Sequence, residues 1–377
     1  MQSNMLRMAI RATAAAAALG VAGQAGAVNF SAGEYDVSVY GYARLNASYD
    51  IDEEVGISTR SGAYSAINTS DADLPTGVFA ADAVQTRLGV KTTTPEGVNI
   101  TVEGDFRPGQ LRLRHGFGEY KGVLMGQTWS NFNSFVGNTS TLDFDSLPGL
   151  AGLQGRVAQV RYTTGPLSFS AEQPNSSILD AGGAEKDGMP ALTARLENSA
   201  GGFSYSAAVL AHQVGYDTGT ADEASFGFAT FGAAKIALSD MITIQGTVSY
   251  SDGANSYLYR SGENFGAESA YVAANGDVET ISGYGASVGT GISLGGGRSI
   301  NIGYGMATVD WDDAEADLGA AAVAAKSETN SAIMANYQWT PVNNVMMGVE
   351  YQMLSRENVD GSDGDANRIL FAAQYNF

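Results

Sequence analysis

Arginines that alternate with apolar residues are the part of this sequence best suited to chemistry. In residues 111–117, Arg112 and Arg114 share one parity. The opposite parity holds Leu111, Leu113, His115 and Phe117. This period of two predicts a β-strand with one charged and one apolar face. Guanidinium groups bind carboxylates in a bidentate fashion, so a row of arginines favours contact with anionic groups. Asp143 and Asp145 end the polar segment that follows, and aspartates opposite the arginines would create a transverse electric field.

The same alternation predicts strands along most of the chain. In residues 37–49, Arg44 and Asn46 lie on a polar face, whereas Val39 and Leu45 lie on an apolar face. About sixteen such segments follow one another, an even number as in single-chain bacterial barrels. Their apolar faces are too small to fill one large soluble core, but they could face lipid while the polar faces line a channel. We therefore predict an all-β fold, a 16-stranded antiparallel transmembrane β-barrel.

The predicted connectors alternate between short and long. Lys121-Gly122 and Gly165-Pro166 are short, whereas residues 51–81 and 213–224 form long connectors. Short periplasmic turns and long external loops are typical of outer-membrane barrels. Residues 131–155 are predicted to form a third loop that folds inward and constricts the channel; the alternative is that this loop stands outside like the others. Many acidic residues lie in the long connectors, which indicates a solvated surface or divalent-cation bridges to lipopolysaccharide.

The two ends of the chain indicate the compartment. Arg7 and Arg11 precede an apolar stretch, and Ala25-Gly26-Ala27 fits a cleavage site, so residues 1–27 are predicted to be a signal peptide. The apolar stretch is shorter than the roughly 20 residues of a membrane-spanning helix. Residues 28–377 are then the barrel domain, placed in the outer membrane of a Gram-negative bacterium. The final strand ends on Phe377 and resembles the insertion signal of such proteins.

The composition argues against other classes of protein. Among 377 residues, 40 are acidic and 20 basic, for a net charge of −20, which disfavours nucleic-acid binding. The chain has no cysteine, and His115 and His212 lie on different strands without a third ligand in a motif, so we predict no metal and no cofactor. No G-x-S-x-G motif is present, and we predict no catalytic residues and no enzyme. An outer-membrane hydrolase and an adhesin are the less favoured alternatives.

The parity of the arginines places them inside the predicted barrel. An arginine facing lipid would cost about 2–4 kcal/mol near the midplane, so the polar faces must line the lumen. Two interpretations are open, and they can coexist: the arginines attract anions, or they pair with Glu103, Asp105 and Glu119 to stiffen the wall. Arg195 could extend the row. The predicted pore-lining residues are Arg44, Arg87, Arg112, Arg114, Arg156, Arg161, Asp143 and Asp145.

The middle of the chain resembles a known family. The run RLRHGFGEYKGVLMGQTWSNF, followed by TLDF and RVAQVRY, resembles the DcaP-like porins, trimeric outer-membrane channels for dicarboxylates. It resembles more loosely the general trimeric porins of Gram-negative bacteria. The resemblance covers residues 112–162 and implies a homotrimer whose constriction is lined by Arg112, Arg114, Arg156 and Arg161. Members of that family can carry a periplasmic coiled-coil extension, whereas here only residues 28–36 precede the first predicted strand.

Together these patterns predict an outer-membrane porin, a water-filled channel for passive diffusion of small hydrophilic solutes, in particular anionic ones such as dicarboxylates. The alternative is a general, cation-biased porin without a preferred substrate. An acidic channel mouth concentrates cations and repels anions over a screening length of about 8–10 Å.

Overall fold

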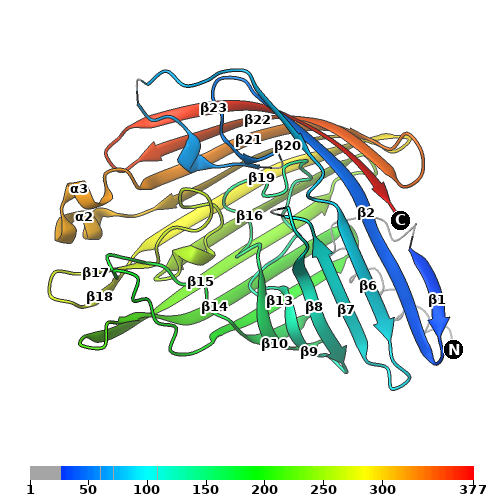
Figure 1. Ribbon diagram of the computed structural model, residues 1–377, viewed down its shortest axis with the longest axis horizontal. Coiled ribbons are helices and arrows are strands. Elements are labelled where there is room, and N and C mark those ends of the chain that lie inside the picture. The colour runs from blue at the N-terminus through cyan, green and yellow to red at the C-terminus, as the bar shows by residue number, and fades with distance from the viewer. Residues whose placement is uncertain (1–26, 60, 71, 108) are drawn as a thin grey trace.

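The computed structural model describes residues 27–59, 61–70, 72–107 and 109–377. The predicted signal peptide lies almost entirely outside the described residues. Within them, 16 strands form a closed antiparallel barrel, which confirms the predicted fold (Figure 1). The barrel strands are β2 (Tyr35–Asp50), β6 (Arg87–Thr93), β7 (Asn99–Asp105), β8 (Arg112–Tyr120), β9 (Val123–Trp129), β10 (Arg156–Thr164), β11 (Leu167–Glu172), β13 (Ala191–Ala200), β14 (Phe203–Asp217), β15 (Asp222–Ala237), β16 (Ile242–Asp252), β19 (Ser282–Gly295), β20 (Arg298–Val309), β21 (Ser327–Trp339), β22 (Val345–Asn358) and β23 (Asp363–Asn376).

Two further short strands complete the seam where the barrel closes. The last strand, β23, pairs with the upper half of β2, and β1 (Val28–Ala32) pairs with the lower half on the same edge. On the other edge of β2, β5 (Val78–Asp82) and β6 share its length. β5 lies almost entirely within the long connector predicted over residues 51–81, and the chain turns between β5 and β6, where the Thr86 amide donates to the Ala83 carbonyl. The prediction that residues 28–36 precede the first strand is wrong, because these residues contain β1.

The outer face of the barrel is apolar, as the alternation predicts. Val248 is 64% exposed and Val209 is 55% exposed, although both lie in the middle of long strands. A row of exposed aliphatic side chains is the surface that a barrel presents to lipid. Near the strand ends, Phe203 stacks on Tyr205, and Tyr337 stacks on Trp339, as in an interfacial aromatic girdle. No helix in the described part of the chain is long and apolar enough to cross a membrane.

The connectors differ at the two ends of the barrel. The C-terminus and the tight turns lie at one end, on the right of Figure 1, and the long connectors lie at the other. The connector predicted over residues 213–224 is wrong in extent, because β14 and β15 stay paired to Asp217 and Asp222 and leave only 218–221 as a loop. The long connectors contain β3 (Gly56–Ser58), β4 (Ser61–Gly62), η2 (Tyr64–Ala66), β12 (Ile178–Leu179), η3 (Asn255–Tyr257), β17 (Ala270–Val272), β18 (Val278–Thr280), α2 (Asp312–Leu318) and α3 (Ala320–Val323).

The connector between β9 and β10 folds into the barrel, which confirms the predicted inward loop. We call residues 131–155 the constriction loop. Phe132 packs against Phe231 of β15 with ring centroids 5.1 Å apart. Farther along, the Thr247 hydroxyl of β16 donates to the Gly149 carbonyl at 2.6 Å. The loop thus lies against the inner face of the wall formed by the longer strands.

Candidate functional site: a lumenal arginine cluster

A β-bulge in β8 turns two consecutive side chains inward. Opposite β7, Glu103 pairs with His115 while Gly104 pairs with Leu113, so Arg114 is an extra residue in the ladder. A bulge of this kind reverses the parity of the residues beyond it. Arg114 is fully buried, and the buried His115 contacts the Thr128 hydroxyl through Nδ1 at 2.9 Å. The prediction that His115 lies on the apolar outer face is therefore wrong.

Four arginines gather around two carboxylates of β7. We call Arg87, Arg112, Arg114 and Arg156 the arginine cluster. Asp105 accepts Arg112 Nε at 2.6 Å and Arg114 Nη1 at 2.8 Å. Glu103 accepts Arg114 Nε at 3.0 Å, and Arg87 Nη1 lies 3.7 Å from the same carboxylate. The arginines therefore do pair with Glu103 and Asp105, as one of the two interpretations of the sequence expected.

These ion pairs leave the cluster positively charged. Three guanidinium groups pair with the two carboxylates. The fourth, that of Arg156, packs over the Trp129 ring, 4.6 Å from its centroid, and has the other three arginines among its electrostatic neighbours. Arg87 Nε, Arg114 Nη2 and Arg156 Nη1 are buried and have no hydrogen-bond acceptor among the described residues. A buried donor without an acceptor is costly, and a charged donor more so. Arg112 is the member that a solute in the lumen can reach, because its side chain is 38% exposed.

The remaining predicted arginines lie apart from this cluster. Arg44 donates to Asn46 at 2.9 Å and to the Leu142 carbonyl of the constriction loop at 2.9 Å. Arg161 donates to Gln159 and to the Trp129 carbonyl, each at 2.9 Å. Arg195 donates to the Asn133 carbonyl. Thus the structure brings four of the predicted arginines together, whereas Arg44 and Arg195 hold the constriction loop.

Asp143 does not face the arginine cluster, contrary to the prediction. Its carboxylate accepts Gln352 Nε2 of β22 at 3.0 Å and the amides of Asp145 and Ser146 at 2.8 and 3.0 Å. Burial raises the pKa of the Asp143 carboxyl, and the charge of Arg260 opposes that effect. The physical reason for the error is the local turn, which Asp143 closes with its own carboxylate.

The side chain of the loop that contacts the arginines is that of Phe144, which lies between the two aspartates in the sequence. The guanidinium carbons of Arg87 and Arg114 each lie 5.4 Å from the centroid of the Phe144 ring. This separation is within the range of a cation–π interaction. Asp145 is buried beside Asp143, with Arg260 among its electrostatic neighbours.

Two buried carboxylates of the wall hold the constriction loop, and neither was identified from the sequence. At the start of the loop, Glu172 of β11 accepts the Ser130 hydroxyl and the Asn131 amide, both at 2.6 Å. Near its tip, Glu350 of β22 accepts the Leu142 and Asp143 amides at 2.7 and 2.9 Å. Their inward parity is visible in the sequence, but the loop backbone that they bind is not.

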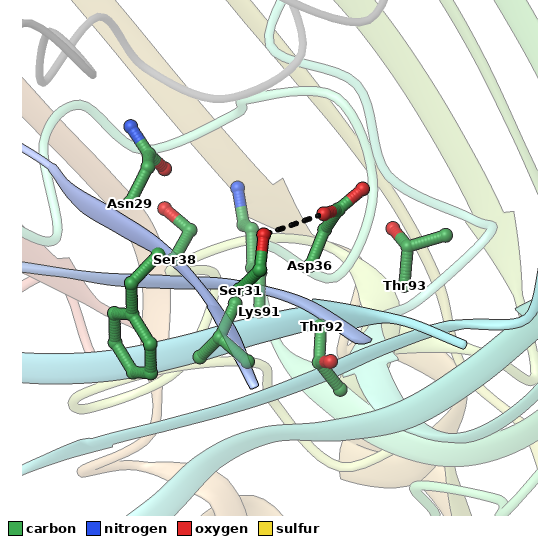
Figure 2. A pocket seen from close by; sticks show the side chains of 9 residues that line it. Asn29, Ser31, Asp36, Ser38, Lys91, Thr92 and Thr93 are labelled. Carbon is green, nitrogen blue, oxygen red and sulfur yellow. Dashed lines mark hydrogen bonds between the residues drawn. The ribbon is translucent and has the colours of Figure 1, made fainter. Parts of the chain in front are cut away.

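A second concave feature lies at the turn end of the barrel. A groove of about 340 Å³ runs between β1, β2 and β6 (Figure 2). In it the Ser31 hydroxyl donates to Asp36 at 3.5 Å, and Lys91 Nζ lies 4.8 Å from the Tyr40 ring. Its charged lining residues, Asp36 and Lys91, have no net charge together, so the arginine cluster is the stronger candidate for contact with anionic solutes. In the described ranges, no group of three or more His, Asp or Glu could hold a metal ion.

A closed barrel of 16 strands, narrowed by an inward loop opposite a charged wall, defines the class of outer-membrane porins. The model of the DcaP outer membrane protein family matches residues 22–377, and the chain belongs to that family. An outer-membrane location follows from this membership and from the barrel.

Solved structures agree with this assignment. The outer membrane channel DcaP of Acinetobacter baumannii is 28% identical, with a TM-score of 0.78 over 93% of this chain and 100% of that one. The anion-selective porin from Comamonas acidovorans is 10% identical, with a TM-score of 0.56 over 91% and 100%. OmpF of Salmonella typhi, in complex with daunomycin, is 13% identical, with a TM-score of 0.56 over 93% and 100%. The last two show a shared fold alone. None of the curated proteins searched matches this chain.

Proposed function

We propose that this porin lets small hydrophilic solutes diffuse passively across the outer membrane and favours small anions such as dicarboxylates. The observation that carries the proposal is the surplus of two positive charges in the arginine cluster, which holds four guanidinium groups and two carboxylates. The surplus charge would attract a carboxylate passing along the wall, and Arg112, whose side chain is 38% exposed, would donate to it. The proposal assigns no catalytic residue to the chain.

The second candidate is a general, cation-biased porin. It is favoured by the acidic connectors at the external end, of which α2 carries Asp312, Asp313 and Glu315 in its first turn. These carboxylates would concentrate cations near the mouth, but screening limits their field to about 8–10 Å at ordinary salt. We propose that the arginine cluster lines the constriction, where every permeating ion would pass, and we therefore expect it to dominate selectivity.

Single-channel recording in a planar bilayer tests the proposal. We expect the reversal potential under a KCl gradient to show anion selectivity, and added succinate to reduce the chloride current. Cation selectivity that succinate leaves unchanged would support the second candidate and contradict the anion preference.

We also propose that the barrel assembles as a homotrimer through its short strands. β7 and β9 have 7 residues each and β11 has 6. At about 3.3 Å per residue and a tilt of about 45°, a strand of this length rises only about 16 Å, less than the apolar band of about 25 Å. Neighbouring copies of the chain would cover the part of the barrel that these short strands form. Closure of the channel in three equal steps would support a trimer, and single-step closure would contradict it.

The acidic connectors are proposed to bind lipopolysaccharide through divalent cations. Lipopolysaccharide that co-purifies in magnesium but is lost in a chelator would support such bridges. Equal retention in both buffers would contradict them.

A further inference from the structure

The tip of the constriction loop is held from behind by a buried carboxylate. Glu350 is fully buried, and its two oxygens accept the Leu142 and Asp143 amides. Asn336 and Gln352 of the wall donate to the same carboxylate at 2.9 and 2.8 Å. Four donors thus surround one charge, which fixes the backbone of the tip against β22.

A buried cation from a different connector locks the other side of the tip. Arg260, fully buried, donates to the Ser146 carbonyl through Nη1 and to the Gly62 carbonyl through Nη2, the latter at 2.7 Å. Its guanidinium group also packs 4.8 Å from the centroid of the Tyr64 ring. Three connectors that are far apart in the sequence therefore meet at Arg260, and the loop tip cannot rotate without breaking these contacts.

Glycines in the wall allow the constriction loop to pack closely against the wall. A Cβ atom on Gly303 would lie 2.8 Å from Leu147 Cδ1, and one on Gly348 would lie 2.8 Å from Leu142 Cδ2. A Cβ atom on Gly305 would overlap the Pro148 carbonyl oxygen. Larger residues there would push the loop away from the wall, toward the arginine cluster.

The orientation of Phe144 follows from these contacts. Leu142 and Asp143 are bound to β22 and Ser146 to Arg260, and the Phe144 ring lies against Arg87 and Arg114. The edges of both guanidinium groups contact the carboxylate of Glu103, and that of Arg114 also contacts Asp105. The ring therefore lies at cation–π distance from two guanidinium groups that also pair with carboxylates of the wall.

We propose that Phe144 is a specificity-determining residue that limits how strongly anions are held at the arginine cluster, and that Glu350 and Arg260 are the residues that position it. This inference rests on the proposed anion preference. Conduction requires binding strong enough for entry and weak enough for release. The negative face of the ring competes with a solute carboxylate for the same cations, so it speeds the release of the anion.

The test compares F144A, F144L and the unchanged protein in planar bilayers, in KCl with and without succinate. F144A removes both the bulk and the aromatic face, and we expect a larger chloride conductance. Its half-blocking succinate concentration should fall by about two- to fivefold, the strength of an exposed cation–π contact expressed as a binding ratio. F144L keeps bulk but loses the aromatic face, so its conductance should stay near that of the unchanged protein while its succinate block strengthens as in F144A. F226A removes an exposed ring from the outer face of β15 and should change neither quantity.

The positioning role is tested with E350Q and the double variant F144A/E350Q. If Glu350 acts by holding Phe144, E350Q strengthens succinate block in the single variant but adds nothing in the presence of F144A. Fully additive effects would overturn the positioning role. A half-blocking concentration that is equal in F144A and the unchanged protein would overturn the role of Phe144. If succinate blocks neither protein and both select cations, the proposed anion preference itself fails. An F144A conductance equal to that of the unchanged protein would contradict the expected increase in chloride current.

Discussion

Arg156 is the member of the arginine cluster whose removal should most cleanly reveal the field in the channel. Its guanidinium group packs over Trp129, and its Nη1 has no acceptor among the described residues. The variant R156Q removes one charge without leaving an unpaired carboxylate, whereas replacing Arg112 or Arg114 would remove an ion-pair partner of Asp105.

The size of the effect follows from Coulomb's law. One unit charge about 6 Å from a permeating ion contributes about 0.7 kcal/mol in water, which corresponds to a roughly threefold change in the local anion concentration. The surplus charge of the cluster falls from two to one, which lowers the local chloride concentration about threefold and raises the local potassium concentration about threefold. The ratio of chloride to potassium permeability should therefore fall by about tenfold at low salt. At 1 M salt the screening length is about 3 Å, and the difference should largely disappear.

The assay is the reversal potential under KCl gradients centred on low and high salt. R298Q is the matched control, because Arg298 is exposed at the turn end of β20 and binds only the Gly295 carbonyl among the described residues. It removes the same charge outside the cluster and should leave selectivity unchanged. Equal shifts in R156Q and R298Q would show that net charge, rather than the cluster, sets selectivity, and no shift in R156Q would refute the reasoning.

Three further perturbations test how the constriction loop is held. E350L leaves four buried donors without their acceptor and should lower the free energy of unfolding by about 2–4 kcal/mol, measured by urea titration in lipid vesicles. E223L, at an exposed position, should have little effect. Equal losses in the two variants would contradict the role of Glu350 in holding the loop. G305V should displace Pro148 and lower the single-channel conductance, whereas G232V, where a new Cβ meets only Val248 at 3.8 Å, should not. Burial raises the pKa of Asp143, so its folded form binds the proton more tightly than its unfolded form, and its contribution to stability is present at low pH and lost as pH rises from about 4 through the raised pKa. The stability of the unchanged protein relative to D143N should therefore decline as the pH rises above about 4, and a constant difference would contradict the assigned environment.

The sequence by itself determined the class of fold and the compartment. Alternating parity is a local property, so it identifies strands such as residues 37–49 and requires their apolar faces to meet lipid. The cost of a charge in lipid places Arg44, Arg87 and Arg112 inside without any knowledge of the tertiary structure. The run around residues 112–162 indicated the family that the comparison confirms.

Tertiary structure decided which groups meet. The bulge opposite Glu103 turned His115 inward, and bulges depend on the register of the neighbouring strand rather than on parity alone. The turn at Asp143 directed its carboxylate toward β22 and left Phe144 against the arginines. The contact between Asp143 and Gln352 joins residues 209 positions apart, and only the closed barrel brings them within hydrogen-bond distance.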